Sequence, residues 1–182
     1  MNTDQFWELV DSTRGFRDRA DSLAKLLEQL TPDEIVRFRI VYDDLIFMAN
    51  KVDLWGAAHV INGGCSDDGF YYFREALIEL GRPIFEAAVR APDSLADIAN
   101  PGEEMAMAEG LGNAPMQAWT AKTGESEEAF YEAVDNVDEV SNRGDAEEGE
   151  WWNFSKPAEV RHRLPRLAAK FLSDADDEPV GH

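Results

Sequence analysis

Apolar residues recur every three or four positions over most of the first ninety residues, which is the spacing of one buried helix face. The first clear run predicts a helix over about residues 18–30, with a stripe made of Leu23, Leu26, Leu27 and Leu30. The next run predicts a helix that continues toward Asn50, with a stripe made of Ile35, Phe38, Tyr42, Leu45 and Ala49. The sequence has no convincing alternation of apolar and polar residues, which is the pattern of a half-buried strand.

Helix boundary signals divide this pattern into separate elements. Thr31 is expected to cap a helix that begins at the following proline, because Glu34 completes a capping box with it. Asp53 is expected to cap a later helix, and the glycine pair 63–64 is expected to end that helix. Ser66 then caps another helix, with acidic residues in its first turn. The sequence therefore predicts a helix–loop–helix corner at this point.

The remaining patterns predict further helices over residues 83–92, 103–109, 116–122, from 124 onward and 157–172. The expected fold class is mainly α, a single-domain orthogonal helical bundle of about seven to nine helices with no substantial sheet. This helical domain is expected to cover residues 1–172, and residues 173–182 are expected to form an acidic, disordered tail. A chain of 182 residues can bury a core without a disulfide or a metal.

The net charge of −20, from 17 basic and 37 acidic residues, restricts the possible partners. Such a chain is repelled by nucleic acid and by anionic membranes, so neither is expected as a partner. The sequence has no apolar stretch of about 20 residues, as a membrane helix needs, and no signal-peptide pattern. Its single cysteine fits a reducing compartment. We expect a soluble cytoplasmic protein whose partner is a basic protein or a cationic small ligand.

The charge is unevenly distributed along the chain. Residues 124–150 contain eleven acidic residues against Arg143 alone. The basic residues that follow them are Lys156, Arg161, Arg163, Arg166 and Lys170. One interpretation is that this basic segment packs near the acidic one within the molecule. The alternative is an acidic face that binds a cationic partner.

An unusual concentration of Trp, Cys, Gly and Asp lies in residues 53–85. This segment contains a Leu-Trp pair, the loop Gly-Gly-Cys-Ser-Asp-Asp-Gly-Phe at residues 63–70, and a later Gly-Arg pair. With these motifs the chain resembles the bacterial domain-of-unknown-function 4240 family. The resemblance extends more weakly to residues 6–10 and 118–124. It implies a shared fold and a shared loop, in a family whose biochemical role is not established.

Cys65 is the first candidate for chemistry, because it lies at the beginning of a predicted helix, where the helix dipole favours a thiolate. A nucleophilic cysteine also needs a histidine, and His59 on the preceding helix is the only plausible one. The neighbouring aspartates would disfavour a thiolate. The alternative is a small side chain buried at a tight helix–helix corner.

Asp67 and Asp68 are consecutive, so on a helix they diverge by about 100° and cannot clamp one ion together. They are expected to act through the helix dipole, and the alternative is that one of them binds an amine, a guanidinium or a metal. Arg74 is expected to form an ion pair with Asp67 rather than to bind an anion. Trp55 and Trp7 are expected in the core, and would be stacking platforms if they line a groove.

No metal or cofactor is expected. Glu159 and His162 have the Glu-x-x-His spacing of di-metal bundles, but that site needs two such motifs and the chain has one. The sequence also lacks the His-Glu-x-x-His, Gly-x-Ser-x-Gly and phosphate-loop motifs.

We therefore expect a non-catalytic binding or regulatory module whose groove is built around the loop at residues 63–70. The residues expected to contact a ligand or partner are Trp55, His59, Cys65, Ser66, Asp67, Asp68 and Arg74. One alternative is a small enzyme that uses Cys65, or an aspartate such as Asp68, with His59. Further alternatives are an immunity-type inhibitor or charge mimic of a basic protein, and a metal-binding bundle. The oligomeric state is not predicted.

Overall fold

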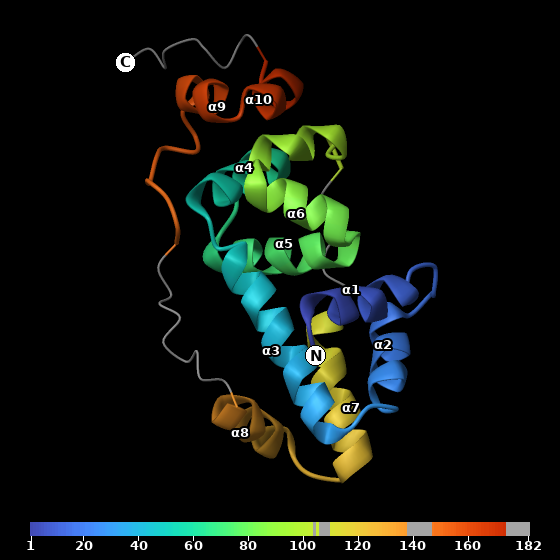
Figure 1. Ribbon diagram of the computed structural model, residues 1–182. Coiled ribbons are helices and arrows are strands. Elements are labelled where there is room, and N and C mark those ends of the chain that lie inside the picture. The colour runs from blue at the N-terminus through green and yellow to red at the C-terminus, as the bar shows by residue number, and fades with distance from the viewer. Residues whose placement is uncertain (104, 106–109, 138–146, 174–182) are drawn as a thin grey trace. The chain divides into compact units, whose positions relative to one another are not determined.

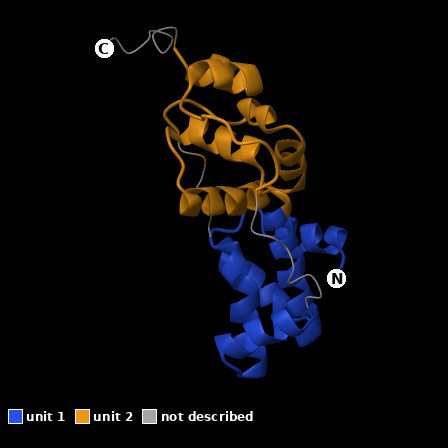
Figure 2. Ribbon diagram, turned by 90° about the vertical axis from the view of Figure 1, so that its left-hand side faces the viewer, with its two compact units in different colours: residues 1–47, 108–145 blue, residues 48–107, 146–182 orange. Residues whose placement is uncertain are grey.

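The computed structural model describes residues 1–103, 105, 110–137 and 147–173, and these form ten α-helices and two short 3-10 helices (Figure 1). The chain separates into two compact units (Figure 2). Unit 1 consists of Met1–Phe47 and Ala108–Asp145, and unit 2 consists of Met48–Met107 and Ala146–His182. The mainly α fold class is confirmed, since the described residues contain only an isolated bridge between Lys51 and Glu148 as β-type pairing. The expectation of one domain over residues 1–172 stays a prediction.

Unit 1 contains the first three α-helices and two later ones. Its elements are α1 (Thr3–Ser12), α2 (Arg19–Leu27), α3 (Pro32–Met48), η2 (Leu111–Asn113), α7 (Ala114–Thr123) and α8 (Glu127–Val137). Met48, the last residue of α3, belongs to unit 2. The capping box predicted at Thr31 is confirmed, because the Thr31 backbone N–H donates to Glu34 (2.8 Å) and the Glu34 N–H donates to the Thr31 hydroxyl (3.3 Å). Short-range sequence signals thus define the beginning of α3.

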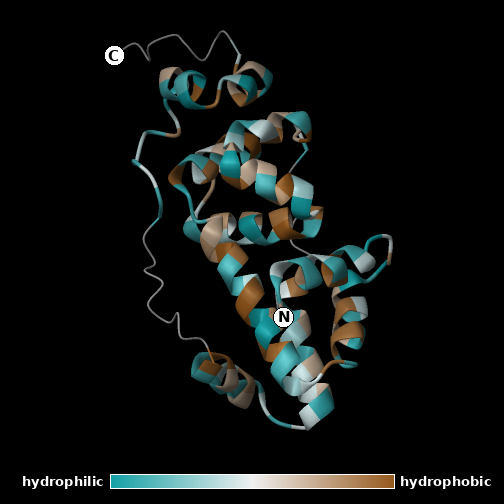
Figure 3. Cartoon of the chain, viewed as in Figure 1, coloured by the Kyte–Doolittle hydropathy of each residue, from teal (hydrophilic) through white to brown (hydrophobic). Residues whose placement is uncertain are grey.

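The core of unit 1 is aromatic and follows the predicted stripes. Phe6 of α1 packs on Phe38 of α3 with ring centroids 4.6 Å apart, and Trp7 meets the same Phe6 ring edge-on at 5.3 Å. On the other helix pair, Trp119 of α7 packs against Phe130 of α8. The expectation that Trp7 is buried is confirmed. Figure 3 shows the alternation of apolar and polar residues along these helices that produces the stripes.

Unit 2 contains the predicted helix–loop–helix corner. Its elements are α4 (Val52–Asn62), α5 (Asp67–Leu80), α6 (Arg82–Arg90), η1 (Pro92–Asp97), α9 (Pro157–Arg163) and α10 (Pro165–Phe171). α10 contacts both α4 and η1, so the last described helix packs on elements that lie about 70–110 residues earlier in the chain. The fully buried residues of this core include Leu54, Ala57, Ala58, Phe70, Leu77, Ile78, Phe85, Leu164 and Leu167.

Three boundary predictions are wrong. Asp53 does not cap α4, because Lys51 occupies the N-cap position and Asp53 lies in the first turn. Gly124 does not begin a helix; it ends α7 in the left-handed conformation (φ 75°), and α8 begins at Glu127. The predicted helix over residues 157–172 is divided at Leu164, since the residue before a proline avoids helical geometry.

The division at Leu164 contributes to a helix count above the seven to nine expected. The helix predicted over residues 103–109 lies largely outside the described residues, as does the predicted tail from residue 174 onward. Among the described residues, no helix is both long and apolar enough to cross a membrane.

Candidate functional site

The loop between α4 and α5 is shaped by two glycines with positive φ and by a hydrogen bond from one indole. Gly63 ends α4 with φ 67° and Gly64 follows with φ 143°, a region that side-chain-bearing residues rarely adopt. Ser66 caps α5, as predicted, and accepts a hydrogen bond from the Gly69 N–H (3.2 Å). The Trp55 indole N–H donates to the Cys65 carbonyl at 3.1 Å. α4 and the loop are therefore tied together directly.

Trp55 and Arg74 are brought together through an aromatic ring. The Trp55 indole stacks on Phe70 with ring centroids 4.9 Å apart and planes 13° apart. The Arg74 guanidinium lies 4.8 Å from the Phe70 centroid and 5.6 Å from that of Tyr71. Trp55 is half-buried, so it is neither fully in the core nor a free platform.

The predicted ion pair between Arg74 and Asp67 is wrong. Within the described residues, Asp67 has no ion pair, and the Arg74 guanidinium lies over the Phe70 and Tyr71 rings. Burial lowers the pKa of Arg74, and its attraction to neighbouring acidic groups opposes this effect. An arginine remains charged in either case.

Cys65 and His59 do not form the arrangement of an activated cysteine. The His59 Nε2 atom lies 3.2 Å from the Ser155 hydroxyl, and the Cys65 thiol lies 3.6 Å from the Ser66 carbonyl oxygen. Burial raises the pKa of the Cys65 thiol and lowers the pKa of His59. Both shifts oppose a thiolate–imidazolium pair, which needs the reverse directions.

The exposed side of α5 combines acidic and aromatic side chains. Asp67 and Asp68 are exposed in its first turn, and Tyr71 and Tyr72 follow one helical turn later. Residues four apart lie next to each other on a helix, so each aspartate is adjacent to a tyrosine. Tyr72 is 53% exposed. We call these four residues the α5 acidic face.

The C-terminal segment supplies further side chains that the sequence did not assign to the site. Trp151 meets Trp55 edge-on at 5.2 Å and is itself 54% exposed. Phe154 lies 6.4 Å from the Trp55 ring and 5.8 Å from the His59 ring. The sequence signal was the density of aromatic residues at 151–154. No local pattern indicates which helix such residues contact.

The Glu-x-x-His spacing in α9 has a structural explanation. Glu159 accepts a hydrogen bond from the Asn153 N–H (3.0 Å) and pairs with Lys156 (3.2 Å). The Asn153 hydrogen bond contributes most to lowering the pKa of Glu159. In the described part of the chain, no three His, Cys, Asp or Glu side chains come together in a way that could hold a metal ion.

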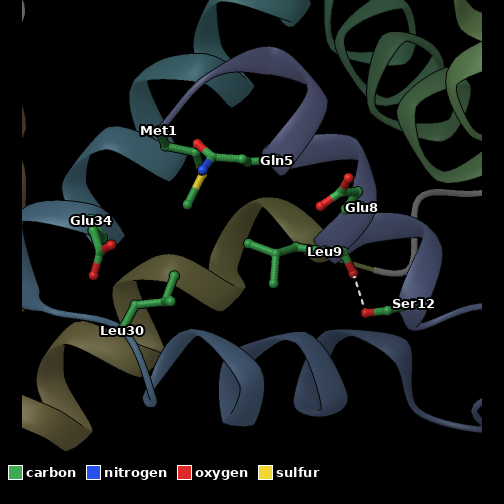
Figure 4. Close-up of a pocket in the computed structure, with 7 residues that line it drawn as sticks. All are labelled: Met1, Gln5, Glu8, Leu9, Ser12, Leu30 and Glu34. Carbon is green, nitrogen blue, oxygen red and sulfur yellow. Dashed lines mark hydrogen bonds between the residues drawn. The ribbon is translucent and has the colours of Figure 1, made fainter.

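Unit 1 has a pocket of about 350 Å³ that the sequence did not indicate (Figure 4). Its lining residues are Met1, Gln5, Glu8, Leu9, Ser12, Leu30 and Glu34. Several of the polar groups are already bonded locally: the Ser12 hydroxyl donates to the Leu9 carbonyl, and Glu34 accepts two hydrogen bonds from Thr31. These Thr31 bonds lower the pKa of Glu34.

The basic C-terminal residues pair with acids of unit 2. Arg163 contacts Asp53 and Glu150, and Arg166 contacts Asp97. The acidic residues described between 124 and 137 are all exposed and have no ion pair within the described residues: Glu125, Glu127, Glu128, Glu132 and Asp135. Of the described residues of the acidic segment, Glu150 pairs with Arg163. For the rest of that segment, the interpretation that the basic segment packs near it stays a prediction.

These features define a mainly α-helical protein with a hydrogen-bonded helix–loop–helix corner and an aromatic cluster. The model of one family, described as "Protein of unknown function (DUF4240)", matches residues 1–137. The chain belongs to this family, which confirms the resemblance carried by the loop at residues 63–70. No curated protein and no solved structure matches the chain.

Proposed function

We propose that this protein is a non-catalytic binding module that recognises a basic segment of a partner protein through the α5 acidic face. The observation that carries the proposal is the adjacency of two exposed carboxylates, Asp67 and Asp68, to two tyrosine rings on one rigid helix. Asp67 and Asp68 have no ion pair within the described residues, so their charges are available to a cation.

The chemistry of this face suits lysine and arginine side chains. A carboxylate attracts the cationic head, and a tyrosine ring adds a cation–π contact of about 0.5–1 kcal/mol at an exposed position. The beginning of a helix has a partial charge of about +0.5, which the two aspartates together exceed. The local potential is therefore negative. The net charge of −20 adds long-range attraction of basic partners.

The rigidity of the corner supports binding without a conformational change. The hydrogen bond from Trp55 to the Cys65 carbonyl (3.1 Å) and the Trp55–Phe70 stack fix the loop against α4 and α5. Asp67 therefore begins α5 from a fixed position. A surface that is already ordered loses less conformational entropy on binding.

The enzyme alternative lacks this support. It requires Cys65 or an aspartate to act with His59, but His59 bonds to Ser155 and the pKa shifts of Cys65 and His59 oppose activation. The reactivity of Cys65 tests this alternative directly.

A fluorescein-labelled lysine–arginine decapeptide is the probe for the proposed function, with fluorescence anisotropy as the measurement. The double variant Asp67→Asn/Asp68→Asn removes the two charges of the face. We expect it to bind roughly tenfold more weakly than the unchanged protein, and Tyr72→Ala to bind more weakly as well. Raising the salt concentration should weaken binding of the unchanged protein.

The matched control is Glu127→Gln/Glu128→Gln, which removes two exposed charges from the first turn of another helix, α8. If the α5 acidic face is the site, this control retains binding within a factor of about 3. Equal losses in the two double variants would contradict the proposal, because they would indicate attraction by net charge alone.

A charge mimic of a basic protein is a second candidate, favoured by the exposed acids between Glu125 and Asp135 that lack ion pairs in the described residues. It predicts the opposite ranking of the same variants. The α8 double variant would then lose more affinity than the α5 double variant.

A further inference from the structure

The last described part of the chain belongs to unit 2 but lies outside the region that matches the family. Residues 150–171, which we call the C-terminal arm, contain α9 and α10 and lie beyond residues 1–137. The arm contacts α4 and η1, all within unit 2. It is also the most basic stretch of the chain. The family-matched elements therefore bind a segment of distinct composition.

The first anchor of the arm is the Trp152 indole, which is only 9% exposed. The indole lies against Gly56 of α4, and a Cβ added at Gly56 would lie 2.8 Å from Cη2 of Trp152. The indole N–H donates to Oδ1 of Asp53 at 2.9 Å. Arg163 reaches the same Oδ1 atom at 3.3 Å and covers the Trp152 ring at 5.6 Å. The space left by Gly56, next to the Asp53 carboxylate, thus holds the Trp152 indole, and Arg163 binds the same carboxylate.

The second anchor is formed by acids of η1. Asp93 accepts backbone hydrogen bonds from Arg166 (3.0 Å) and Leu167 (2.9 Å) at the beginning of α10. The Arg166 guanidinium pairs with Asp97. Lys170 donates to the Ala96 carbonyl at 3.0 Å. The arm's positive charges therefore meet acceptors on η1.

Between these anchors the arm buries one apolar side. Val160, Leu164, Leu167 and Ala168 are each at most 2% exposed. These residues recur at the spacing of one helix face, although α9 and α10 are separated at Leu164. The surface on α4 and η1 thus combines an apolar floor with the acceptors Asp53, Asp93 and Asp97. Amphipathic helices are bound by proteins in this way, with an apolar face in a groove and charges at its rim.

We propose that the α4–η1 surface is a docking site for a basic, tryptophan-bearing amphipathic helix of another protein, and that this chain fills it with its own arm. The arm acts as an intramolecular competitor, present at the millimolar effective concentration that a short connection gives. A partner helix binds only the fraction of molecules in which the arm has left, so its apparent affinity is reduced by that fraction. This site includes none of the four residues of the α5 acidic face, although Trp151 of the arm also meets Trp55 beside the corner.

The direct test uses the full chain with the arm weakened at its first anchor and a labelled peptide of residues 147–173 as the probe. Trp152→Ala/Arg163→Ala removes both contacts to Asp53. We expect this variant to bind the peptide at least about tenfold more tightly than the unchanged chain does. Adding Gly56→Ala to the variant fills the space in which the Trp152 indole lies, so the triple variant should bind the peptide no more tightly than the unchanged chain does. A folded variant that binds the peptide no more tightly than the unchanged chain would overturn the proposal.

Hydrogen exchange in the unchanged protein tests whether the arm opens independently of α4, even if that variant does not fold. The Leu164 and Ala168 amides, bonded within the arm, are compared with the Ala58 amide inside α4. A reversibly docked arm opens alone, so its amides should exchange at least about tenfold faster than Ala58, with little dependence on denaturant. Equal protection and equal denaturant dependence would mean that the arm and α4 open only together, which would overturn the proposal. Neither measurement involves Asp67 or Asp68, so a failure here is distinguishable from a failure of the proposed function.

Discussion

The indole nitrogen of Trp55 donates a hydrogen bond to the carbonyl of Cys65, 3.1 Å away across the corner between α4 and α5. The same indole stacks on Phe70, in the first turns of α5. One side chain of α4 thus contacts both the loop and the helix that follows it. The loop at residues 63–70 owes its fixed shape to this residue as much as to its glycines.

Trp55→Phe separates the two contacts, because phenylalanine keeps a stacking ring but has no donor. Loss of a typical hydrogen bond destabilises a protein by about 0.5–1.5 kcal/mol, and the half-buried Cys65 carbonyl would lose its indole donor. We expect a decrease of this size in the free energy of unfolding, measured by urea titration. Phe70→Leu, which removes the stack and keeps the donor, is the matched comparison. A Trp55→Phe protein of unchanged stability would show that the hydrogen bond does not hold the loop.

Gly56 and Trp152 make a second testable pair. Alanine is a better helix former than glycine by up to about 1 kcal/mol, but at Gly56 its Cβ would collide with the Trp152 ring. Overpacking of this kind costs about 1–3 kcal/mol, so Gly56→Ala should destabilise the protein. In a Trp152→Ala background the collision is absent, and the same change should be neutral or stabilising. Additive effects in this double-mutant cycle would contradict the packing described for the two residues.

The parts of the fold that sequence predicts well are those decided by residues three or four positions apart. Ser66 caps α5 and Thr31 pairs with Glu34, because each contact closes within one helical turn. Gly63 ends α4 because the left-handed conformation there suits glycine. Each of these features depends on chemistry that can be read in a short window.

The parts that sequence missed depend on residues far apart in the chain. Asp53 has the side chain of a helix cap, yet it bonds to Trp152, 99 positions later, while Lys51 occupies the cap position. Arg74 is an exception, because its guanidinium lies over the rings of Phe70 and Tyr71, within one helical turn, and forms no pair with the acid seven positions earlier. Periodicity predicts which side of a helix is buried, and it does not identify the segment that covers that side.

Gly64 provides a test of backbone strain at the corner. Its φ of 143° is rarely adopted by residues with a side chain, and an added Cβ would meet no atom within 4 Å. The cost of Gly64→Val is therefore conformational, at about 1–3 kcal/mol for such a position. We expect a lower urea midpoint with an unchanged slope. Asn62→Val, an exposed position at the end of α4, is the control and should be milder. A Gly64→Val protein that unfolds like the parent would show that the corner does not need this conformation.

The reactivity of Cys65 separates the binding and enzyme hypotheses. Burial raises the pKa of this thiol, so less thiolate is present at neutral pH than in the unfolded chain, where the pKa is about 8.5. Alkylation of native protein should be slower than alkylation in urea at each pH, and its rate should titrate at a higher pH. Fast native labelling that titrates below the unfolded reference would support an enzyme that uses Cys65.

His59 makes stability depend on pH near neutrality. Burial lowers its pKa in the folded protein below the value of about 6.5 expected in the unfolded chain. Above about pH 7.5 both states are neutral and His59 contributes no pH dependence. As the pH falls through about 6.5, the unfolded chain takes up a proton that the folded protein does not, so the unfolded state is favoured and stability decreases. The decrease stops once the pH is below the folded pKa.

Urea titrations between pH 5.5 and 8 should show a smaller decrease in stability for His59→Gln than for the parent protein. His162→Gln, which changes an exposed histidine, is the control. An identical pH dependence in parent and His59→Gln would mean that His59 is protonated equally in both states, and that burial does not lower its pKa in the folded protein.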